Sequence, residues 1–317
     1  MISKDVKLAA TFLKNDGVVG IPTETVYGLA GNAYSDIAIN KIFEVKKRPN
    51  SNPLILHVKN GNELDKIGTQ IPELAYKLAE AFWPGPLTLI VKKQPHISNL
   101  ITASQDTVAV RVPNHTLTLE LLNSIYFPLV APSANPFTRI SPIEAPHVEA
   151  YFKDQINMVL DGGRCSEGVE STIVGFENNR AIVYRLGAIS IEEIEKITNN
   201  VSVYKPLDKK IITPGMLKKH YSPYTDIILT RNVSQEIEWF SDKKIGLLLF
   251  NAPQPNFNLA YQKILSPDSN LKIATSNLYK ALHELDAMNL DLIIAERFPE
   301  YGLGLTINDR LTRATKK

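Results

Sequence analysis

The sequence contains one cysteine, Cys165, among 317 residues. An intrachain disulfide is therefore excluded, and so is a zinc site built from several cysteines. All apolar runs stay below the ~18 residues that a membrane-spanning helix needs, so we expect no membrane span. The N-terminal segment also differs from a signal peptide, because Asp5 and Asn15 interrupt its apolar pattern.

An excess of charge of one sign is missing as well. Lys and Arg contribute 35 residues and Asp and Glu contribute 33, which leaves a net charge of +2. A protein that binds nucleic acid through bulk charge is more basic than this. Any contact with RNA would therefore need a local basic patch.

The common nucleotide-binding and hydrolase motifs are also absent. The sequence has no Walker-type phosphate-binding loop, and Gly302-Leu303-Gly304 lacks the third glycine and the preceding strand of a dinucleotide fingerprint. The HExxH and GxSxG motifs are missing too. An ATP site in this chain must therefore use another arrangement.

What is present is the composition of a globular protein, with 44% hydrophobic and 21% charged residues. A chain of this length is typical of about two domains. After an amphipathic N-terminal helix that ends before Gly17, helices are expected at residues 36–46, 71–82 and 117–125. Short buried strands are expected at residues 18–21, 53–58, 87–91, 108–112, 129–131, 158–160, 171–174 and 181–184. Because several strands follow each other directly, the pattern predicts an α/β domain with a twisted, mixed sheet.

A second block of strands and helices begins near residue 225. Strands are expected at 226–229, 244–250 and 291–295, and helices at 270–288 and 306–314, which predicts a small Rossmann-like domain. A proline-rich segment separates the two blocks, and we interpret it as a linker. The predicted organisation is a first domain at 1–205, a linker at 206–224 and a C-terminal domain at 225–317.

Polar residues follow or interrupt several predicted strands, a common place for ligands in α/β proteins. The segment PTETVYGL (22–29) places Thr23, Glu24 and Thr25 after a buried strand, and the alternative is a turn with capping hydroxyls. Arg111 interrupts an apolar strand in TVAVRVP (107–113). A buried arginine needs an anionic partner, which is either a bound carboxylate or an internal Asp or Glu; the other alternative is an exposed position on an edge strand.

Three further segments show similar patterns. In KKRPNSNPLILHV (46–58) cations end a predicted helix, where they complement the helix dipole even without a ligand. His57 closes the next strand, a position typical of a core histidine as well as of a ligand. LVAPSANPFTRIS (129–141) supplies small polar side chains suited to phosphate or ribose, with a proline-rich turn as the alternative. GVEST (168–172) and YRLGAI (184–189) again place a polar residue beside a strand.

In this order and spacing, these segments resemble the YrdC-type threonylcarbamoyl-AMP synthases, in the long form with an additional C-terminal domain. The family's lysine–x–arginine and serine–x–asparagine signature appears as Lys46-Lys47-Arg48 and Ser133-Ala134-Asn135. The resemblance covers residues 5–204 and continues through PGMLKKHYSP (214–223) into the C-terminal domain.

The resemblance implies a nucleotidyltransferase that forms L-threonylcarbamoyl-AMP and pyrophosphate from L-threonine, bicarbonate or CO2, and ATP. The catalytic signature would be Lys46, Arg48, Ser133 and Asn135. The positions that match the family's threonine site are Thr25, His57, Arg111, Ala131 and Ser171. The positions that match its ATP site are Arg48, Asn52, Thr107, Ser133, Ser141, Arg185 and Tyr221.

The resemblance also implies a Mg²⁺ requirement with ATP and a cytoplasmic location. A separate transferase complex would use the product to form threonylcarbamoyladenosine next to the anticodon of tRNA, with at most a weak tRNA contact here. Because the carbamate and its adenylate are labile in water, we expect residues 214–223 to form a lid over the cleft, with Tyr221 reaching the nucleotide.

Two other functions stay open at this stage. The same fold occurs as a carbamoyl-adenylate module in hydrogenase-maturation carbamoyltransferases, whose cysteine zinc fingers the single cysteine excludes here. A non-catalytic RNA-binding or ribosome-associated module would also use a basic cleft. The low net charge and the lack of interleaved aromatic and basic residues weigh against that module.

Overall fold

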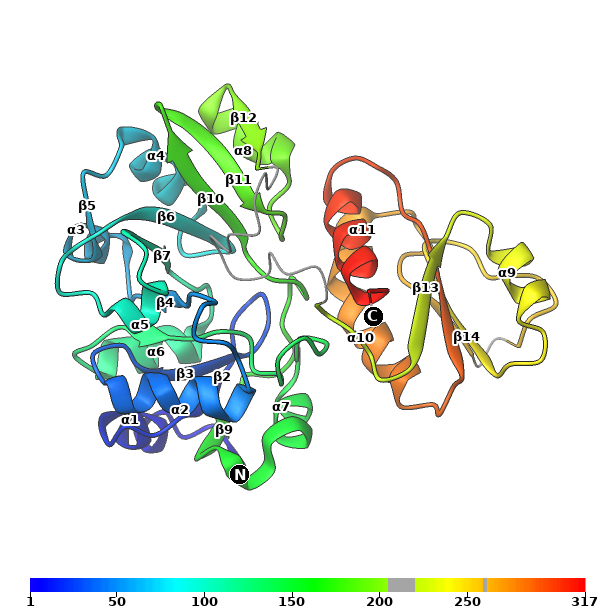
Figure 1. The fold of residues 1–317 in the computed structure, drawn as a ribbon, viewed down its shortest axis with the longest axis horizontal. Coiled ribbons are helices and arrows are strands. Elements are labelled where there is room, and N and C mark those ends of the chain that lie inside the picture. The colour runs from blue at the N-terminus through cyan, green and yellow to red at the C-terminus, as the bar shows by residue number, and fades with distance from the viewer. Residues whose placement is uncertain (205–219, 259–260, 317) are drawn as a thin grey trace.

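The computed structural model describes residues 1–204, 220–258 and 261–316. Figure 1 shows two domains, a large one formed by the first two thirds of the chain and a smaller one that contains the C-terminus. Strand β12 (Val201–Val203) belongs to the larger sheet, and β13 (Asp226–Thr230) is the first strand of the smaller sheet. Most of the predicted linker, residues 206–219, lies outside the described residues, and so does the greater part of the expected lid.

The large domain is built on a sheet to which the described residues contribute 12 strands. The strands before β12 are β1 (Ile2–Ser3), β2 (Val19–Ile21), β3 (Gly28–Asn32), β4 (Ile55–His57), β5 (Gly68–Thr69), β6 (Leu87–Lys93), β7 (Thr107–Arg111), β8 (Leu129–Val130), β9 (Met158–Leu160), β10 (Thr172–Glu177) and β11 (Arg180–Arg185). Their order is β1-β9-β2-β3-β8-β4-β7-β6-β10-β11-β12, and β5 pairs with β6. Strand β7 is parallel to β4 and antiparallel to β6. The predicted mixed sheet is therefore confirmed.

The helices of this domain are α1 (Val6–Lys14), α2 (Asp36–Lys46), α3 (Leu64–Ile67), α4 (Glu73–Phe82), α5 (Asn99–Thr102), α6 (Thr116–Ser124), α7 (Ala145–Phe152) and α8 (Ile191–Thr198). Helix α2 begins where the Ser35 side chain accepts the Ala38 N–H. It ends where Lys47 adopts a left-handed conformation with φ 52°. On either side of that turn, Lys46 and Arg48 are both buried. The capping of α2 therefore positions the two cations of the sequence motif.

Strand β3 is an element that the sequence does not predict. Its sequence, GLAGN, contains two glycines, which weaken a strand. Here β3 is held by antiparallel pairing with β2 on one side and β8 on the other. A Cβ added to Gly31 would lie 2.9 Å from Cδ1 of Ile42 in α2. Glycine therefore allows α2 to pack closely on the strand, and tertiary packing outweighs propensity.

The small domain has a parallel sheet in the order β13-β16-β14-β15. Its other strands are β14 (Ile245–Leu249), β15 (Gln262–Ile264) and β16 (Leu292–Glu296), and its helices are α9 (Val233–Trp239), α10 (Leu271–Asp286) and α11 (Leu303–Ala314). Parallel strands that alternate with helices confirm the predicted Rossmann-like domain. In Figure 1, α10 and α11 lie on the side that faces the large domain.

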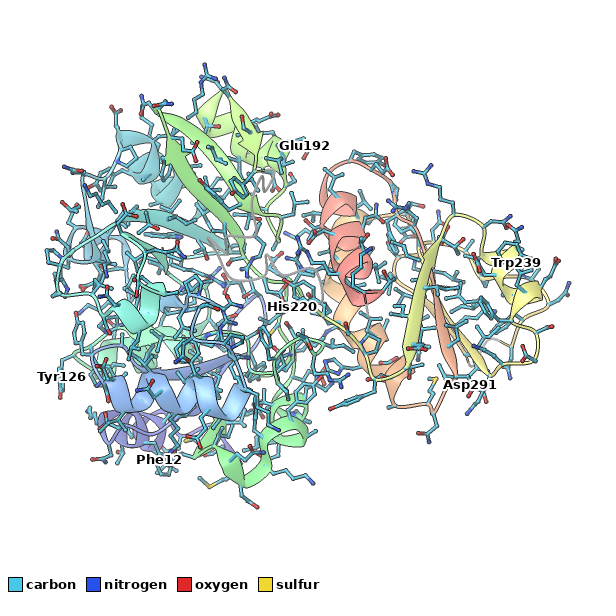
Figure 2. The ribbon with its side chains drawn as sticks, viewed as in Figure 1. Phe12, Tyr126, Glu192, His220, Trp239 and Asp291 are labelled. Carbon is cyan, nitrogen blue, oxygen red and sulfur yellow. The ribbon has the colours of Figure 1, made fainter. Side chains whose placement is uncertain are left out.

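Buried side chains of both domains pack together where the domains meet. One cluster of buried apolar side chains contains Leu56 of β4, Tyr221 of the linker, Leu278 of α10 and Ile307 of α11. His220 lies between the domains in Figure 2. Its backbone N–H donates to the carbonyl of Arg313, and its ring lies edge-on to the ring of Phe137. The described end of the linker is thus packed against both domains.

Candidate active site

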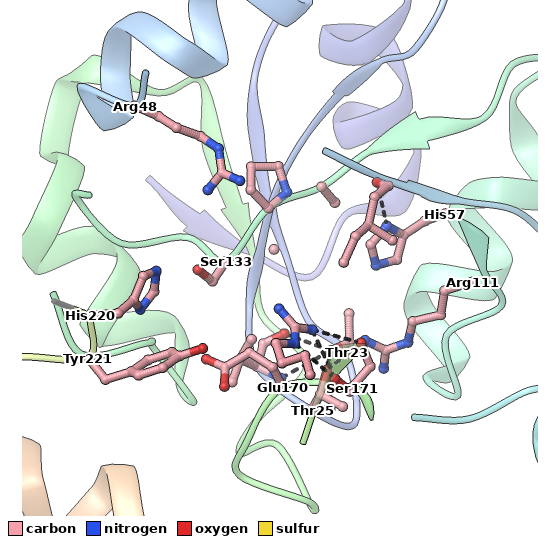
Figure 3. Close-up of a pocket in the computed structure, with 16 residues that line it drawn as sticks. Thr23, Thr25, Arg48, His57, Arg111, Ser133, Glu170, Ser171, His220 and Tyr221 are labelled. Atoms are coloured by element: carbon pink, nitrogen blue, oxygen red, sulfur yellow. Dashed lines mark hydrogen bonds between the residues drawn. The ribbon is translucent and has the colours of Figure 1, made fainter. Parts of the chain in front are cut away.

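A cavity lies at the ends of several strands of the large sheet (Figure 3). Its lining comes from the β2–β3 turn, Arg48 in the turn after α2, and the ends of β4, β7 and β11. The loop after β8, the residues before β10 and the end of the linker complete it. His57 of β4 is the register partner of Arg111 in the parallel strand β7. The two side chains therefore lie side by side at the same edge of the sheet.

Arg111 occupies one wall of the cavity and is 4% exposed. Its Nη1 donates to Oγ1 of Thr25 at 2.9 Å, and its Nε donates to the carbonyl of Gly85 at 3.2 Å. Its Nη2 lies 2.7 Å from Oε1 of Glu24 in a buried ion pair. The internal carboxylate that the sequence left open as an alternative is therefore present. Arg111 nevertheless still lines the cavity, which leaves the bound-carboxylate hypothesis in place.

His57 contributes a neutral imidazole to the cavity. Its Nδ1 lies 3.3 Å from the carbonyl of Ile55, which fits a proton on that nitrogen. Burial, together with the charge of Arg111, lowers the pKa of His57 to about 3. At neutral pH, His57 is thus a polar but uncharged part of the wall, and its Nε2 can accept a hydrogen bond.

Lys46 does not line the cavity but supports its wall from behind. Its Nζ donates to the backbone carbonyls of Ser133 and Asn135. Burial, and then the charge of Arg48, lowers the pKa of Lys46 well below its usual range. The side-chain amide of Asn135 bonds the carbonyls of Pro136 and Arg139. The lysine–x–arginine and serine–x–asparagine motifs are therefore joined in space, with Lys46 holding the loop that presents Ser133.

Two arginines that lie far apart in the sequence line the cavity. Arg48 donates to Oδ1 of Asn52 at 2.6 Å and to the carbonyl of Pro53 at 2.8 Å. Arg185 donates through Nη2 to the carbonyl and the hydroxyl of Ser171, at 3.0 and 3.1 Å. Burial, and then the like charge of Arg185, lowers the pKa of Arg48 to about 9. An anion between these guanidinium groups would relieve that repulsion.

Glu170 also lines the cavity, and its partners come from both domains. Oε1 accepts the Ser141 hydroxyl at 2.6 Å, whereas Oε2 accepts Nε of Arg310 at 2.9 Å and the Tyr279 hydroxyl at 2.9 Å. Burial would raise the pKa of Glu170, but Arg310 and Arg185 outweigh it and hold the pKa at about 2. Glu170 is therefore a carboxylate at neutral pH. Ser141, predicted for the ATP site, donates to Glu170 and does not line the cavity.

Tyr221 closes the side of the cavity next to the small domain and is 1% exposed. Figure 3 shows its ring pointing towards Glu170. Among the described residues its hydroxyl has no hydrogen-bond partner. Ser222 fixes the chain after it, because its N–H donates to the carbonyl of Thr138 at 2.8 Å.

Comparisons with known proteins agree with this geometry. A family model described as telomere recombination (Sua5, YciO and YrdC) matches residues 11–187, and one described as threonylcarbamoyl-AMP synthase, C-terminal domain, matches residues 189–315. The threonylcarbamoyl-AMP synthase of Pyrococcus abyssi is 35% identical over 98% of this chain and 94% of its own. The chain belongs to the threonylcarbamoyl-AMP synthase family.

Other members of the synthase family match over similar lengths. The Bacillus subtilis synthase is 36% identical, over 96% of this chain and 91% of its own. A crystal structure of P. abyssi Sua5 complexed with L-threonine has a TM-score of 0.91 at 35% identity and covers 98% of this chain and 94% of that one. A full-length HypF structure is 20% identical with a TM-score of 0.52, so that likeness shows the fold alone. No helix in the described part of the chain is long and apolar enough to cross a membrane.

The structure of this synthase-family chain places nine of the predicted residues around one cavity: Thr25, Arg48, His57, Arg111, Ala131, Ser133, Ser171, Arg185 and Tyr221. Lys46, Asn52, Asn135 and Ser141 lie behind its walls. Thr107 lies away from the cavity. It is the first residue of β7, where it pairs with Lys92, whereas Arg111 is the last residue of the same strand.

Sequence reasoning assigned no role to Glu170 or His220, yet both line the cavity. The motif GVEST contains Glu170, but nothing in its local pattern distinguishes this carboxylate from a solvated one. His220 lies in the predicted lid segment, where only its neighbour Tyr221 was singled out. Both residues acquire their positions from contacts across the domain boundary.

Proposed function

We propose that this chain forms L-threonylcarbamoyl-AMP and pyrophosphate from L-threonine, bicarbonate or CO2, and ATP. The observation that carries the proposal is the single cavity in which all five predicted threonine residues meet two buried arginines suited to phosphate. Family membership supports the reaction, and the P. abyssi neighbour complexed with L-threonine supports the amino-acid substrate.

We assign L-threonine to the wall formed by Thr25, His57 and Arg111. Arg111 supplies the positive charge that a substrate carboxylate needs, and a hydrogen-bonded guanidinium–carboxylate contact is worth roughly 1.5–3 kcal/mol. Thr25 and neutral His57 supply groups that can bond the threonine hydroxyl or amine. A site that bonds a substrate hydroxyl rejects an analogue without it by up to about 10⁴-fold.

We assign the phosphates of ATP to Arg48 and Arg185, whose charges already oppose each other across the cavity. Magnesium would enter with the nucleotide, since both oxygens of Glu170 already accept hydrogen bonds from protein groups. When bound to the phosphates, Mg²⁺ neutralises part of their charge. The protein contributes the two guanidinium groups.

The chemistry then needs no protein nucleophile. The threonine amine attacks CO2 and gives a carbamate and a proton, or it attacks bicarbonate and gives a carbamate and water. A carbamate oxygen attacks the α-phosphorus of ATP, the bond to the β-phosphate oxygen breaks, and pyrophosphate leaves. Positioning and charge neutralisation supply the catalysis, as in other phosphoryl transfers. Arg48 and Arg185 hold the leaving group while Arg111 holds the amino acid.

The described end of the linker supports the proposed lid. Tyr221 faces the cavity with a hydroxyl that has no partner among the described residues, and a bound nucleotide would supply one. The chain after it is held by Ser222 and by Arg139, whose Nη1 donates to the carbonyl of Pro223 at 3.2 Å. A closed lid would protect the carbamate and the mixed anhydride from water.

We further propose that the product passes to a separate tRNA-modifying transferase complex in the cytoplasm, with no more than weak contact between this chain and tRNA. A mixed anhydride of this kind is reactive enough to be consumed by direct transfer to an amine. The nearly neutral net charge of +2 supports a role upstream of RNA binding.

The test of the reaction is pyrophosphate release from ATP, measured with and without L-threonine and with and without bicarbonate. We expect release only when both are present, together with an adenylate that carries the carbons of threonine and bicarbonate. Pyrophosphate release that does not depend on threonine, or no release at all, would refute the proposal. RNA binding without release would instead favour the non-catalytic module.

A further inference from the structure

We infer that Arg310 of the small domain is a positioning residue for the reaction: it neutralises and orients Glu170, so that the cavity can accept the phosphates of ATP. The inference rests on the proposed function and extends it, because it assigns to the small domain a part in nucleotide binding. It concerns a pair of side chains that belong to different domains and that meet at the wall of the cavity.

The first step of the argument is the position of Glu170. Its carboxylate lines the same cavity as Arg48 and Arg185. A negative charge at this place repels a triphosphate and competes with it for the guanidinium groups. The site therefore works only if another group holds this charge.

The second step is that the small domain supplies that group. Arg310 of α11 is 0% exposed at its side chain, and its Nε donates to Oε2 of Glu170 at 2.9 Å. Tyr279 of α10 adds a hydroxyl at 2.9 Å to the same oxygen. Two helices of the small domain thus bond one carboxylate of the large domain.

The third step is that Arg310 is itself fixed in place. Its Nη2 donates to the carbonyl of Leu186 at 2.6 Å, and its Nη1 donates to Asp309 at 2.6 Å. Its guanidinium also lies over the Tyr221 ring, 4.6 Å from the centroid. Thr306 of α11 also donates to the carbonyl of the neighbouring Gly187 at 2.9 Å. Arg310 therefore supports two residues of the cavity wall, Glu170 and Tyr221, without lining the cavity.

The experiment measures the affinity of the full chain for adenosine, AMP and ATP by calorimetry. In Arg310→Gln the carboxylate of Glu170 loses its cationic partner, so the loss of affinity should grow with the charge of the ligand. We expect less than about 2-fold for adenosine and about 10-fold or more for ATP. A merely structural role would weaken all three ligands alike, and that result overturns the inference.

The double variant Glu170→Gln/Arg310→Gln removes both charges and should restore ATP affinity to within about 3-fold of the unmodified chain. A double variant as weak as the single one overturns the inference. If Arg310→Gln does not fold, Arg310→Lys takes its place: because it keeps the positive charge beside Glu170, its ATP affinity should stay within about 3-fold of the unmodified chain, and a loss of about 10-fold for ATP in Arg310→Lys overturns the inference.

The matched control is Arg164→Gln. Arg164 is exposed and also joins the domains, because its Nη2 donates to the carbonyl of Ser276 at 3.0 Å and to Asn277 at 2.8 Å. Its loss should leave all three affinities unchanged, and an ATP-specific loss equal to that of Arg310→Gln overturns the inference. Failure of the unmodified chain to bind ATP would instead refute the proposed function, so the two failures are distinguishable.

Discussion

Replacing Tyr221 with phenylalanine tests whether the end of the linker contacts the nucleotide. The substitution removes one oxygen and preserves the ring that packs against His220, Tyr279 and the Arg310 guanidinium. Burial raises the pKa of Tyr221 to about 12, so the hydroxyl is protonated and able to donate at neutral pH. Within the described residues, nothing accepts that proton.

The structure therefore predicts opposite effects on stability and on binding. A buried hydroxyl without a partner costs about 1–3 kcal/mol, so the unliganded Tyr221→Phe protein should be at least as stable as the original. If the hydroxyl donates to the nucleotide, ATP binding should weaken by about 1 kcal/mol for a neutral acceptor and up to about 3 kcal/mol for a phosphate oxygen. These values correspond to losses of roughly 5-fold to 150-fold.

The assay combines thermal unfolding without ligand with calorimetric titration of ATP. The matched control is Tyr279→Phe, because its hydroxyl donates to Glu170 at 2.9 Å and its removal should lower stability. Unchanged ATP affinity in Tyr221→Phe would refute the contact with the nucleotide. A loss of stability in that variant would show that the hydroxyl has a protein partner and would refute the argument from burial.

Three further predictions concern the amino acid and pH. Arg111→Ala should weaken L-threonine binding by more than about 1.5 kcal/mol with ATP binding near normal, and a folded variant with unchanged threonine affinity in calorimetry would make Arg111 structural. Pyrophosphate release should be fastest with threonine, slow with serine and hardly detectable with valine, because Thr25 and Ser171 offer hydroxyls in the cavity; equal rates with valine would contradict this. His57, His220 and His283 have ordinary pKa values of 6.5 that fall to about 3 in the folded protein, chiefly through burial. Between these values the unfolded chain binds more protons, so the free energy of unfolding should fall as pH falls, by about 1.4 kcal/mol per pH unit per histidine. Denaturant titrations at several pH values check the slope, which should be shallower in His57→Gln; an unchanged slope would argue against a neutral buried His57.

Local sequence determined most of the regular structure. Helix α2 was predicted at residues 36–46, and the structure has it as Asp36–Lys46, because Ser35 caps one end and apolar residues recur at helical spacing. The buried strands that end at His57 and Arg111 were predicted from short apolar runs bounded by polar or proline residues. The features that predict these elements are local, so the segment that forms each helix or strand contains them in its own sequence. Strand β3 was missed because its glycines disfavour a strand until α2 packs on it.

The motifs, and the resemblance they carry, also determined which residues belong to the cavity, since Thr25, His57, Arg111 and Arg185 all line it. Only the tertiary structure decided which of the other residues line it and which support it. Lys46 donates to a carbonyl of the Ser133–Asn135 loop, and Glu24 forms an ion pair with Nη2 of Arg111. Glu170 becomes part of the site because Arg310, 140 residues away in sequence, neutralises it. The local sequence does not distinguish a solvated carboxylate from a buried, paired one. Only the packing of the two domains against each other brings the partner of Glu170 within hydrogen-bond distance.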